Sequence, residues 1–160
     1  MKAYADTNFF TRFYVPNADL AGVSRLVAQY LDREGEPLPF TPLHRLEFRN
    51  AIRLMVYRRK QPGEVDLSPS QARQILRDHE SDLAQRAFMT PRAIDWTEAL
   101  REAERLSAAH TETTGFRSLD LLHVGAALHL GAGEFYSFDE DARRIAELAG
   151  IAVFPSRGRT

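Results

Sequence analysis

Four acidic residues of this chain could together bind a divalent metal ion: Asp6, Glu47, Asp120 and Asp139. Carboxylates gathered around one point repel one another and raise one another's pKa unless a cation lies between them. All four side chains offer hard oxygen ligands, which Mg²⁺ and Mn²⁺ prefer. The residue types therefore indicate a magnesium or manganese site, provided that the fold brings the side chains together.

The elements expected to position these acids are strands and helices in alternation. Strand-like runs occur at residues 2–6, 37–41, about 92–95, 134–138 and 151–154. Helical periodicity fills the intervals, and this alternation predicts a parallel α/β sheet. Asp6 and Asp139 each follow a strand and precede a helix, which places them at the carboxyl edge, where open α/β sheets bind ligands. Asp120, in the first turn of a helix, is expected at the same edge.

Several helix boundaries carry clear sequence signals. Ser68 is expected to be an N-cap, with Gln71 as its capping-box partner. Thr97 and Ser118 are expected to cap two later helices, and Asp139 to open the last one. These signals divide the chain without indicating a domain boundary.

Length and composition restrict the class of protein. The chain has 160 residues, which predicts a single domain over 1–160, and its formal net charge is −1. A nearly neutral total argues mildly against a simple electrostatic nucleic-acid binder. The absence of cysteine excludes disulfides, thiolate zinc sites and cysteine nucleophiles. No signal core or membrane-spanning stretch is evident, so the sequence favours a soluble cytoplasmic protein with no membrane partner.

Three of the acids also have an ordinary structural interpretation, as helix caps or first-turn acids favoured by the helix dipole. Glu47 does not. In an expected helix over 43–60 it falls on an apolar stripe with Leu43, Ala51 and Leu54. No Lys or Arg lies three or four residues away. A carboxylate on a core-facing stripe therefore needs a partner from elsewhere, either a metal ion or an arginine of another helix.

The same expected helix has a basic side and a second apolar strip. Arg45, Arg49 and Arg53 form a stripe that is either a solvated face or a track for RNA phosphates. The second apolar strip comprises Phe48, Ile52, Met55 and Val56. Because one core does not need two faces of a helix, this strip suggests a protein interface.

Polar residues beside the acids are candidates to orient carboxylates or bound water. They are Thr7, Asn8, Ser118 and Ser137. His44 and His123 match no zinc motif and are expected to be packed or supporting residues. No nucleophile elbow surrounds the serines, and the chain has no Gly-rich phosphate loop.

Taken in order, four segments make the chain resemble the PIN-domain ribonucleases, most closely the VapC-type toxins of toxin–antitoxin pairs. The segments are Ala5–Asn8, Leu46–Glu47, Arg117–Leu128 and Tyr136–Asp139. The resemblance implies a three-layer α/β/α PIN-like fold with a central parallel sheet. It also implies a Mg²⁺- or Mn²⁺-dependent endoribonuclease whose acidic quartet is the four residues named first. RNA as substrate, a homodimer and a cognate VapB-like antitoxin follow from the same resemblance.

Within that resemblance, Asp6, Asp120 and Asp139 are the expected metal ligands, and Glu47 acts through water or as a proton acceptor. The departures from the family pattern are mild: Ser137 replaces the commoner Thr, and Gly125 stands where a small Ala is usual. After Asp139 the chain continues Glu140-Asp141-Ala142, so the fourth acid is Asp139 or Asp141. Asp139 is preferred because it directly follows the strand.

Other functions remain open from the sequence alone. A structure-specific DNA nuclease could use the same acids, although the short chain lacks appended DNA-binding elements. A PIN-like module that binds RNA or protein without cutting is a second alternative, which an incomplete quartet would have favoured. A phosphatase with an aspartyl nucleophile is disfavoured, because Asp6-Thr7-Asn8 lacks the second Asp two residues on.

Overall fold

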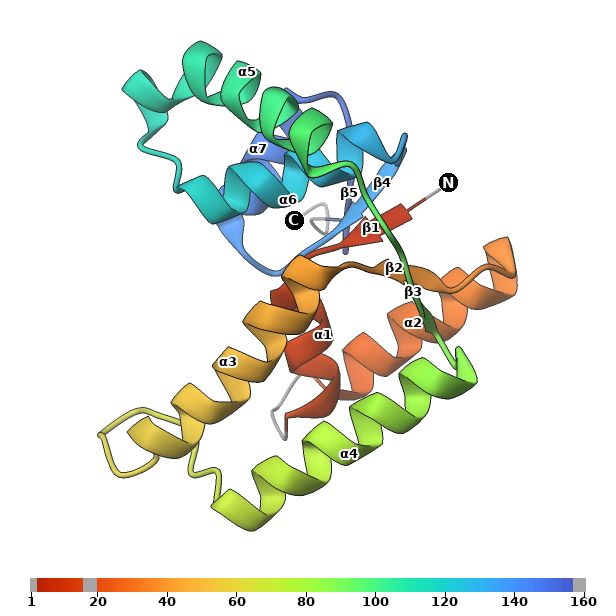
Figure 1. The fold of residues 1–160 in the computed structure, drawn as a ribbon, viewed down its shortest axis with the longest axis vertical. Coiled ribbons are helices and arrows are strands. Elements are labelled where there is room, and N and C mark those ends of the chain that lie inside the picture. The colour runs from red at the N-terminus through yellow and green to blue at the C-terminus, as the bar shows by residue number, and fades with distance from the viewer. Residues whose placement is uncertain (1–2, 16–19, 157–160) are drawn as a thin grey trace. The chain divides into compact units, whose positions relative to one another are not determined.

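Helices and strands alternate along the chain in the computed structural model, which describes residues 3–15 and 20–156 (Figure 1). The elements are β1 (Ala3–Ala5), α1 (Thr7–Tyr14), α2 (Leu20–Glu34), β2 (Leu38–Phe40), α3 (Pro42–Arg58), α4 (Pro69–Gln85), β3 (Met89–Pro91), α5 (Trp96–Thr114), α6 (Ser118–His129), β4 (Glu134–Tyr136), α7 (Glu140–Leu148) and β5 (Ala152–Phe154). All the paired strands are parallel, so the predicted α/β fold with parallel strands is confirmed. Lys2, expected to begin the first strand, lies outside the described residues.

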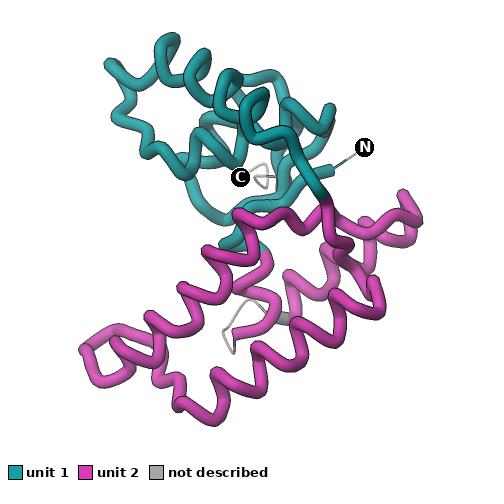
Figure 2. Tube along the Cα trace, viewed as in Figure 1, with its two compact units in different colours: residues 1–9, 93–160 teal, residues 10–92 magenta. Residues whose placement is uncertain are grey.

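The chain forms two compact units (Figure 2). Unit 1 comprises the residues up to Phe9 and those from Ala93 onward, and unit 2 comprises Phe10–Arg92. The strands pair accordingly as two parallel sets, β1-β4-β5 in unit 1 and β2-β3 in unit 2. No helix within the described ranges is both long enough and apolar enough to cross a membrane.

The sheet register of unit 1 brings two distant segments together at one edge. Ala5 lies opposite Tyr136 in the β1–β4 ladder. The backbone N–H of Asp6 extends this ladder by donating to the Tyr136 carbonyl oxygen, at 3.0 Å. Asp6 and Ser137, the residues that follow the two strands, are therefore neighbours at the carboxyl edge of the sheet.

The core of unit 1 holds this edge in place. Tyr4 of β1 and Phe135 of β4 are completely buried and stack with ring centroids 5.9 Å apart. Val124 of α6 and Ile145 of α7 are also completely buried in the same apolar cluster. Each Å² of apolar surface removed from water stabilises the fold by about 25 cal/mol, so this cluster is the main stabilising contribution to unit 1. The helices that carry acidic residues are thus fixed to the sheet through their apolar faces.

Unit 2 has an aromatic core that includes two fully buried histidines, His44 and His79. The ring of His79 in α4 stacks on Phe48 of α3 at 4.4 Å and packs against Phe40 of β2 at 4.7 Å. Burial is the largest cause that lowers the pKa of His79, to about 4. At neutral pH this histidine is uncharged and behaves as a core residue.

The predicted strand at 92–95 and two predicted N-caps are wrong. The strand is Met89–Pro91, which pairs with β2 and buries Met89 completely. Arg92 and Asp95, in the predicted range, are exposed. Asp95 instead caps α5, accepting hydrogen bonds from the backbone N–H groups of Thr97 and Glu98. Ser118, the other predicted N-cap, is instead the first residue of α6; Arg117 is the N-cap and makes no side-chain cap hydrogen bond. The predicted capping box of α4 is confirmed.

The apolar strip of α3 that faces the core is not the one predicted. The buried residues are His44, Phe48 and Ile52, so the strip assigned to a protein interface is the one that packs into the core. Leu54, expected in the core with Glu47, is 36% exposed. The ring contacts that Phe48 makes in the aromatic core decide this orientation. Glu47 is consequently half-buried rather than fully enclosed.

Candidate metal centre

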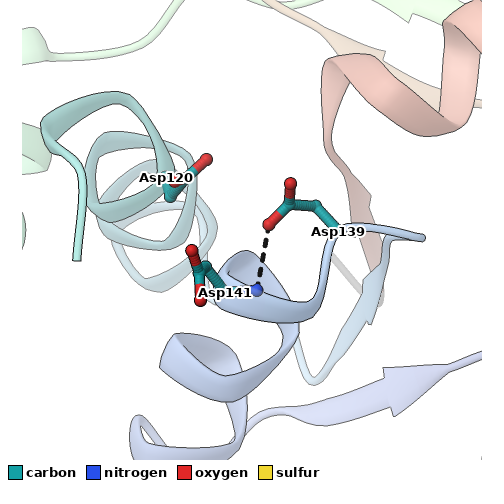
Figure 3. Close-up of side chains that lie close together, drawn as sticks. All are labelled: Asp120, Asp139 and Asp141. Atoms are coloured by element: carbon teal, nitrogen blue, oxygen red, sulfur yellow. Dashed lines mark hydrogen bonds between the residues drawn. The ribbon is translucent and has the colours of Figure 1, made fainter. Parts of the chain in front are cut away.

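Three aspartates converge at the carboxyl edge of unit 1 (Figure 3). Asp120 lies in the first turn of α6, Asp139 is the N-cap of α7, and Asp141 lies in the first turn of α7. One carboxylate oxygen from each falls within 4.8 Å of the others. The structure therefore brings Asp120 and Asp139 together, as the sequence suggested. It also includes Asp141, which had been the alternative to Asp139.

Backbone hydrogen bonds hold the Asp139 carboxylate in position. Its Oδ1 accepts from the N–H group of Asp141 at 3.0 Å (Figure 3). It also accepts from the N–H group of Ala142 at 3.1 Å. The Asp139 N–H in turn donates to the Ser137 hydroxyl at 2.9 Å. The buried Arg143 donates to the Ser137 carbonyl oxygen at 2.8 Å, so this turn is fastened from both sides. Oδ1 is therefore occupied by backbone hydrogen bonds, and Oδ2 is the Asp139 oxygen that faces cationic groups.

Asp6 is joined to the same turn through Ser137. The Ser137 hydroxyl donates to Asp6 Oδ2, and the Phe9 N–H donates to Oδ1 at 2.8 Å. Burial, with a smaller contribution from the charge of Asp139, raises the pKa of Asp6 to about 6, although the Ser137 hydrogen bond opposes the rise. Ser137 thus contacts two of the acids at once. This is the geometry that an orienting residue requires.

The raised pKa of Asp6 gives a prediction for stability in EDTA. Its pKa rises from 3.8 to about 6 on folding, so the folded protein binds the proton more tightly and loses stability as pH rises from about 4 to 6. At 1.36 kcal/mol per unit the loss is at most about 3 kcal/mol. Asp6→Asn removes it and should make the protein about 1–3 kcal/mol more stable than wild type at pH 7.5, with little gain at pH 4.

Urea unfolding of both proteins at the two pH values measures this difference. Asp95→Asn is the matched control, because Asp95 is an exposed N-cap and Asn caps a helix equally well. An Asp6→Asn protein less stable than wild type at pH 7.5 would show that the hydrogen bonds to the carboxylate outweigh its desolvation.

The other predicted polar residues occupy different settings. Thr7 is buried, and its hydroxyl lies 3.3 Å from His123 Nε2, while the hydroxyl of Tyr4 lies 3.0 Å from Nδ1 of the same ring. His123 is therefore a packed histidine behind the acids, as expected. Asn8 and Ser118 are exposed, and their orienting role remains a prediction.

Sequence reasoning gave no role to Arg117, which contacts two of the clustered acids. Its Nε lies 2.9 Å from Asp120 Oδ2, and its Nη2 lies 3.4 Å from Asp139 Oδ2. Burial and the charge of Asp139 raise the pKa of Asp120, although Arg117 opposes the rise. The position of Arg117 three residues before Asp120 was the available signal, because residues at that spacing share a helix face.

Glu47 and the basic stripe belong to unit 2, and their roles remain predictions. Arg49 Nη2 lies 2.6 Å from Glu80 Oε1 of α4, and Arg45 Nη2 lies 3.4 Å from the same oxygen. Two of the three arginines therefore pair α3 with α4, a role that the sequence did not suggest. Arg53 is exposed.

The acidic cluster of unit 1 fits a hard divalent cation. Asp120, Asp139 and Asp141 supply only carboxylate oxygens, the ligands that Mg²⁺ and Mn²⁺ prefer. One guanidinium, that of Arg117, faces two of these carboxylates, so negative charge remains in excess. Burial, and after it the charge of Asp139, produces the net rise in the pKa of Asp120.

Comparisons with known proteins support the fold. No protein-family model matches the sequence, and no curated protein matches it either. Among solved structures, VapC20 of Mycobacterium tuberculosis, described as a toxin that cleaves the sarcin–ricin loop, is similar with a TM-score of 0.61 and 15% identity; the match covers 94% of this chain and 97% of that one. FitAcB from Neisseria gonorrhoeae is similar with a TM-score of 0.63 and 14% identity, covering 95% and 96%. The chain thus shares its fold with a VapC-type toxin, and the expected PIN-like fold is confirmed.

Proposed function

We propose that this protein is a Mg²⁺- or Mn²⁺-dependent endoribonuclease, and the toxin of a VapBC-type toxin–antitoxin system. The observation that carries the proposal is the convergence of three aspartate side chains within 4.8 Å at the carboxyl edge of a parallel sheet. The fold shared with an RNA-cleaving toxin supports RNA hydrolysis among the reactions that such a site could catalyse. In this proposal, RNA is the substrate, the chain forms a homodimer in the cytoplasm, and a VapB-like antitoxin is its partner.

Each residue has a separate task in the proposed reaction. Asp6, Asp120 and Asp139 hold the cation, with Asp141 as an additional carboxylate in reach of it. When bound, a divalent cation lowers the pKa of a water molecule and offsets the negative charge that develops on the phosphate. Ser137 fixes Asp6 and the turn of Asp139 relative to each other. Glu47 accepts a proton from the attacking nucleophile or acts through a bound water.

Metal removal tests the proposal directly. The purified protein should cleave RNA in Mg²⁺, lose the activity in EDTA, and regain it when Mn²⁺ is added in excess. A flap DNA substrate in parallel reactions serves as the comparison for the alternative nuclease, and RNA is expected to be cut faster. Cleavage that persists in EDTA would contradict the metal site, and faster cleavage of the flap DNA would favour the DNA nuclease.

A further inference from the structure

The guanidinium of Arg117 spans two of the proposed metal ligands. Nε and Nη2 approach Asp120 Oδ2 and Asp139 Oδ2 at 2.9 and 3.4 Å, so one group contacts an oxygen on each of two helices. These are oxygens that a cation shared by the two aspartates would use. Asp139 Oδ1 is already engaged by the N-cap hydrogen bonds, which makes the competition for its Oδ2 direct.

The side chain of Arg117 is placed by ion pairs and hydrogen bonds to two carboxylates. Its side chain is 66% exposed, and as the N-cap of α6 it makes no side-chain cap hydrogen bond. The two carboxylates raise the pKa of the guanidinium, so it stays charged. An exposed ion pair of this kind contributes little stability and exchanges easily for a stronger cation. A divalent ion carries twice the charge and is more compact, so it should displace the guanidinium.

A displaced Arg117 would remain beside the ion, because its backbone is fixed at the start of α6. Its planar guanidinium matches the oxygens of a phosphodiester, which it can contact with two parallel hydrogen bonds. The RNA phosphate must approach the same ion. The Arg117 side chain can therefore contact the RNA phosphate once it has left the two aspartates.

We propose that Arg117 is an exchangeable counterion of the acidic cluster: it occupies Asp120 and Asp139 before the metal binds and contacts the RNA phosphate afterwards. The inference rests on the proposed function, since it takes the metal site and the RNA substrate from there. Its consequence is that Arg117 weakens metal binding while strengthening RNA binding. A purely structural ion pair would not have these opposite effects.

The first experiment is a calorimetric titration of the full-length protein with Mn²⁺, which requires no nuclease activity. Arg117→Gln should bind Mn²⁺ about tenfold more tightly than wild type, as expected when two exposed ion pairs no longer compete. Arg105→Gln is the matched control: Arg105 pairs with Glu102 three residues away at 2.8 Å, and its side chain is 63% exposed. If Arg117→Gln binds no more tightly than Arg105→Gln, the inference is wrong.

The second experiment measures RNA cleavage at saturating Mn²⁺. Arg117→Gln should raise KM about tenfold while Arg105→Gln leaves it unchanged, and an unchanged KM for Arg117→Gln would overturn the phosphate contact. Asp120→Asn in the Mn²⁺ titration distinguishes failure of the proposed metal site from failure of the inference about Arg117. Loss of binding in Asp120→Asn without tightening in Arg117→Gln rejects the inference alone. Wild-type binding in Asp120→Asn rejects the proposed metal site and the inference with it.

Discussion

Asp120→Asn is expected to abolish RNA cleavage and Mn²⁺ binding while leaving the protein folded. The carboxamide keeps the shape of the side chain but removes the charge that a cation requires. Loss of several kcal/mol of transition-state stabilisation corresponds to a decrease in kcat of about a thousandfold or more. Folding should not suffer, because burial and Asp139 already disfavour the charged form of Asp120, as its raised pKa indicates.

The measurement combines single-turnover RNA cleavage with Mn²⁺ calorimetry and urea unfolding on the same preparations. Asp95→Asn again serves as control, since it removes one negative charge from unit 1 at an exposed helix cap outside the acidic cluster. Wild-type cleavage by a folded Asp120→Asn protein would refute the proposed function. The pair Asp139→Asn and Asp141→Asn then identifies the fourth acid, and the larger loss is expected for Asp139.

Those elements whose ends carry a local chemical signal could be predicted from the sequence. Ser68 and Gln71 cap α4 reciprocally, as their spacing in the sequence predicted. β3 was misplaced because its three residues are chosen by pairing with β2, and no local pattern marks Met89 as completely buried. Short parallel strands depend on partners distant in the chain, so the residues of the strand alone do not determine where it begins and ends.

The candidate site was predictable where strand order alone fixes position. Asp6 and Ser137 follow paired strands, and the register places them side by side. The direction of a side chain is a different matter. Spacing along α3 could not tell which of two apolar strips would face the core, so the strip that carries Glu47 was wrongly expected to face it. The aromatic contacts of Phe48 that decide the orientation come from Tyr14 of α1 and His79 of α4, both distant from Phe48 in sequence.

Gly125 was treated as a mild departure from the family's usual alanine, and the structure shows that it is not mild. A Cβ at this position of α6 would lie 2.4 Å from the carbonyl oxygen of Ala99 and 2.9 Å from the backbone N of Ala103, both in α5. These neighbours are backbone atoms, which cannot rotate away as a side chain can. An added methyl group must therefore push the two helices apart.

Gly125→Ala is accordingly expected to lower the free energy of unfolding by about 2–4 kcal/mol, because overpacking a closely packed contact outweighs the better helix propensity of alanine. Gly22→Ala is the matched control, since Gly22 is an exposed helical glycine of α2 with nothing within 4 Å of its added Cβ. That change should raise stability by about 0.5–1 kcal/mol. Urea unfolding of the two variants and the wild type measures the expected loss of stability in Gly125→Ala and the expected gain in Gly22→Ala.

The same substitution connects packing to chemistry. α6 carries Asp120 in its first turn, five residues before Gly125, so a displacement of the helix moves a proposed metal ligand. Gly125→Ala should then bind Mn²⁺ more weakly at temperatures where it is fully folded, whereas Gly22→Ala should bind like wild type. If Gly125→Ala is as stable as Gly22→Ala, the close approach of α5 and α6 is not what requires glycine here. If Gly125→Ala is destabilised but binds Mn²⁺ like wild type, α6 adjusts locally at its contact with α5 and its first turn, with Asp120, does not move.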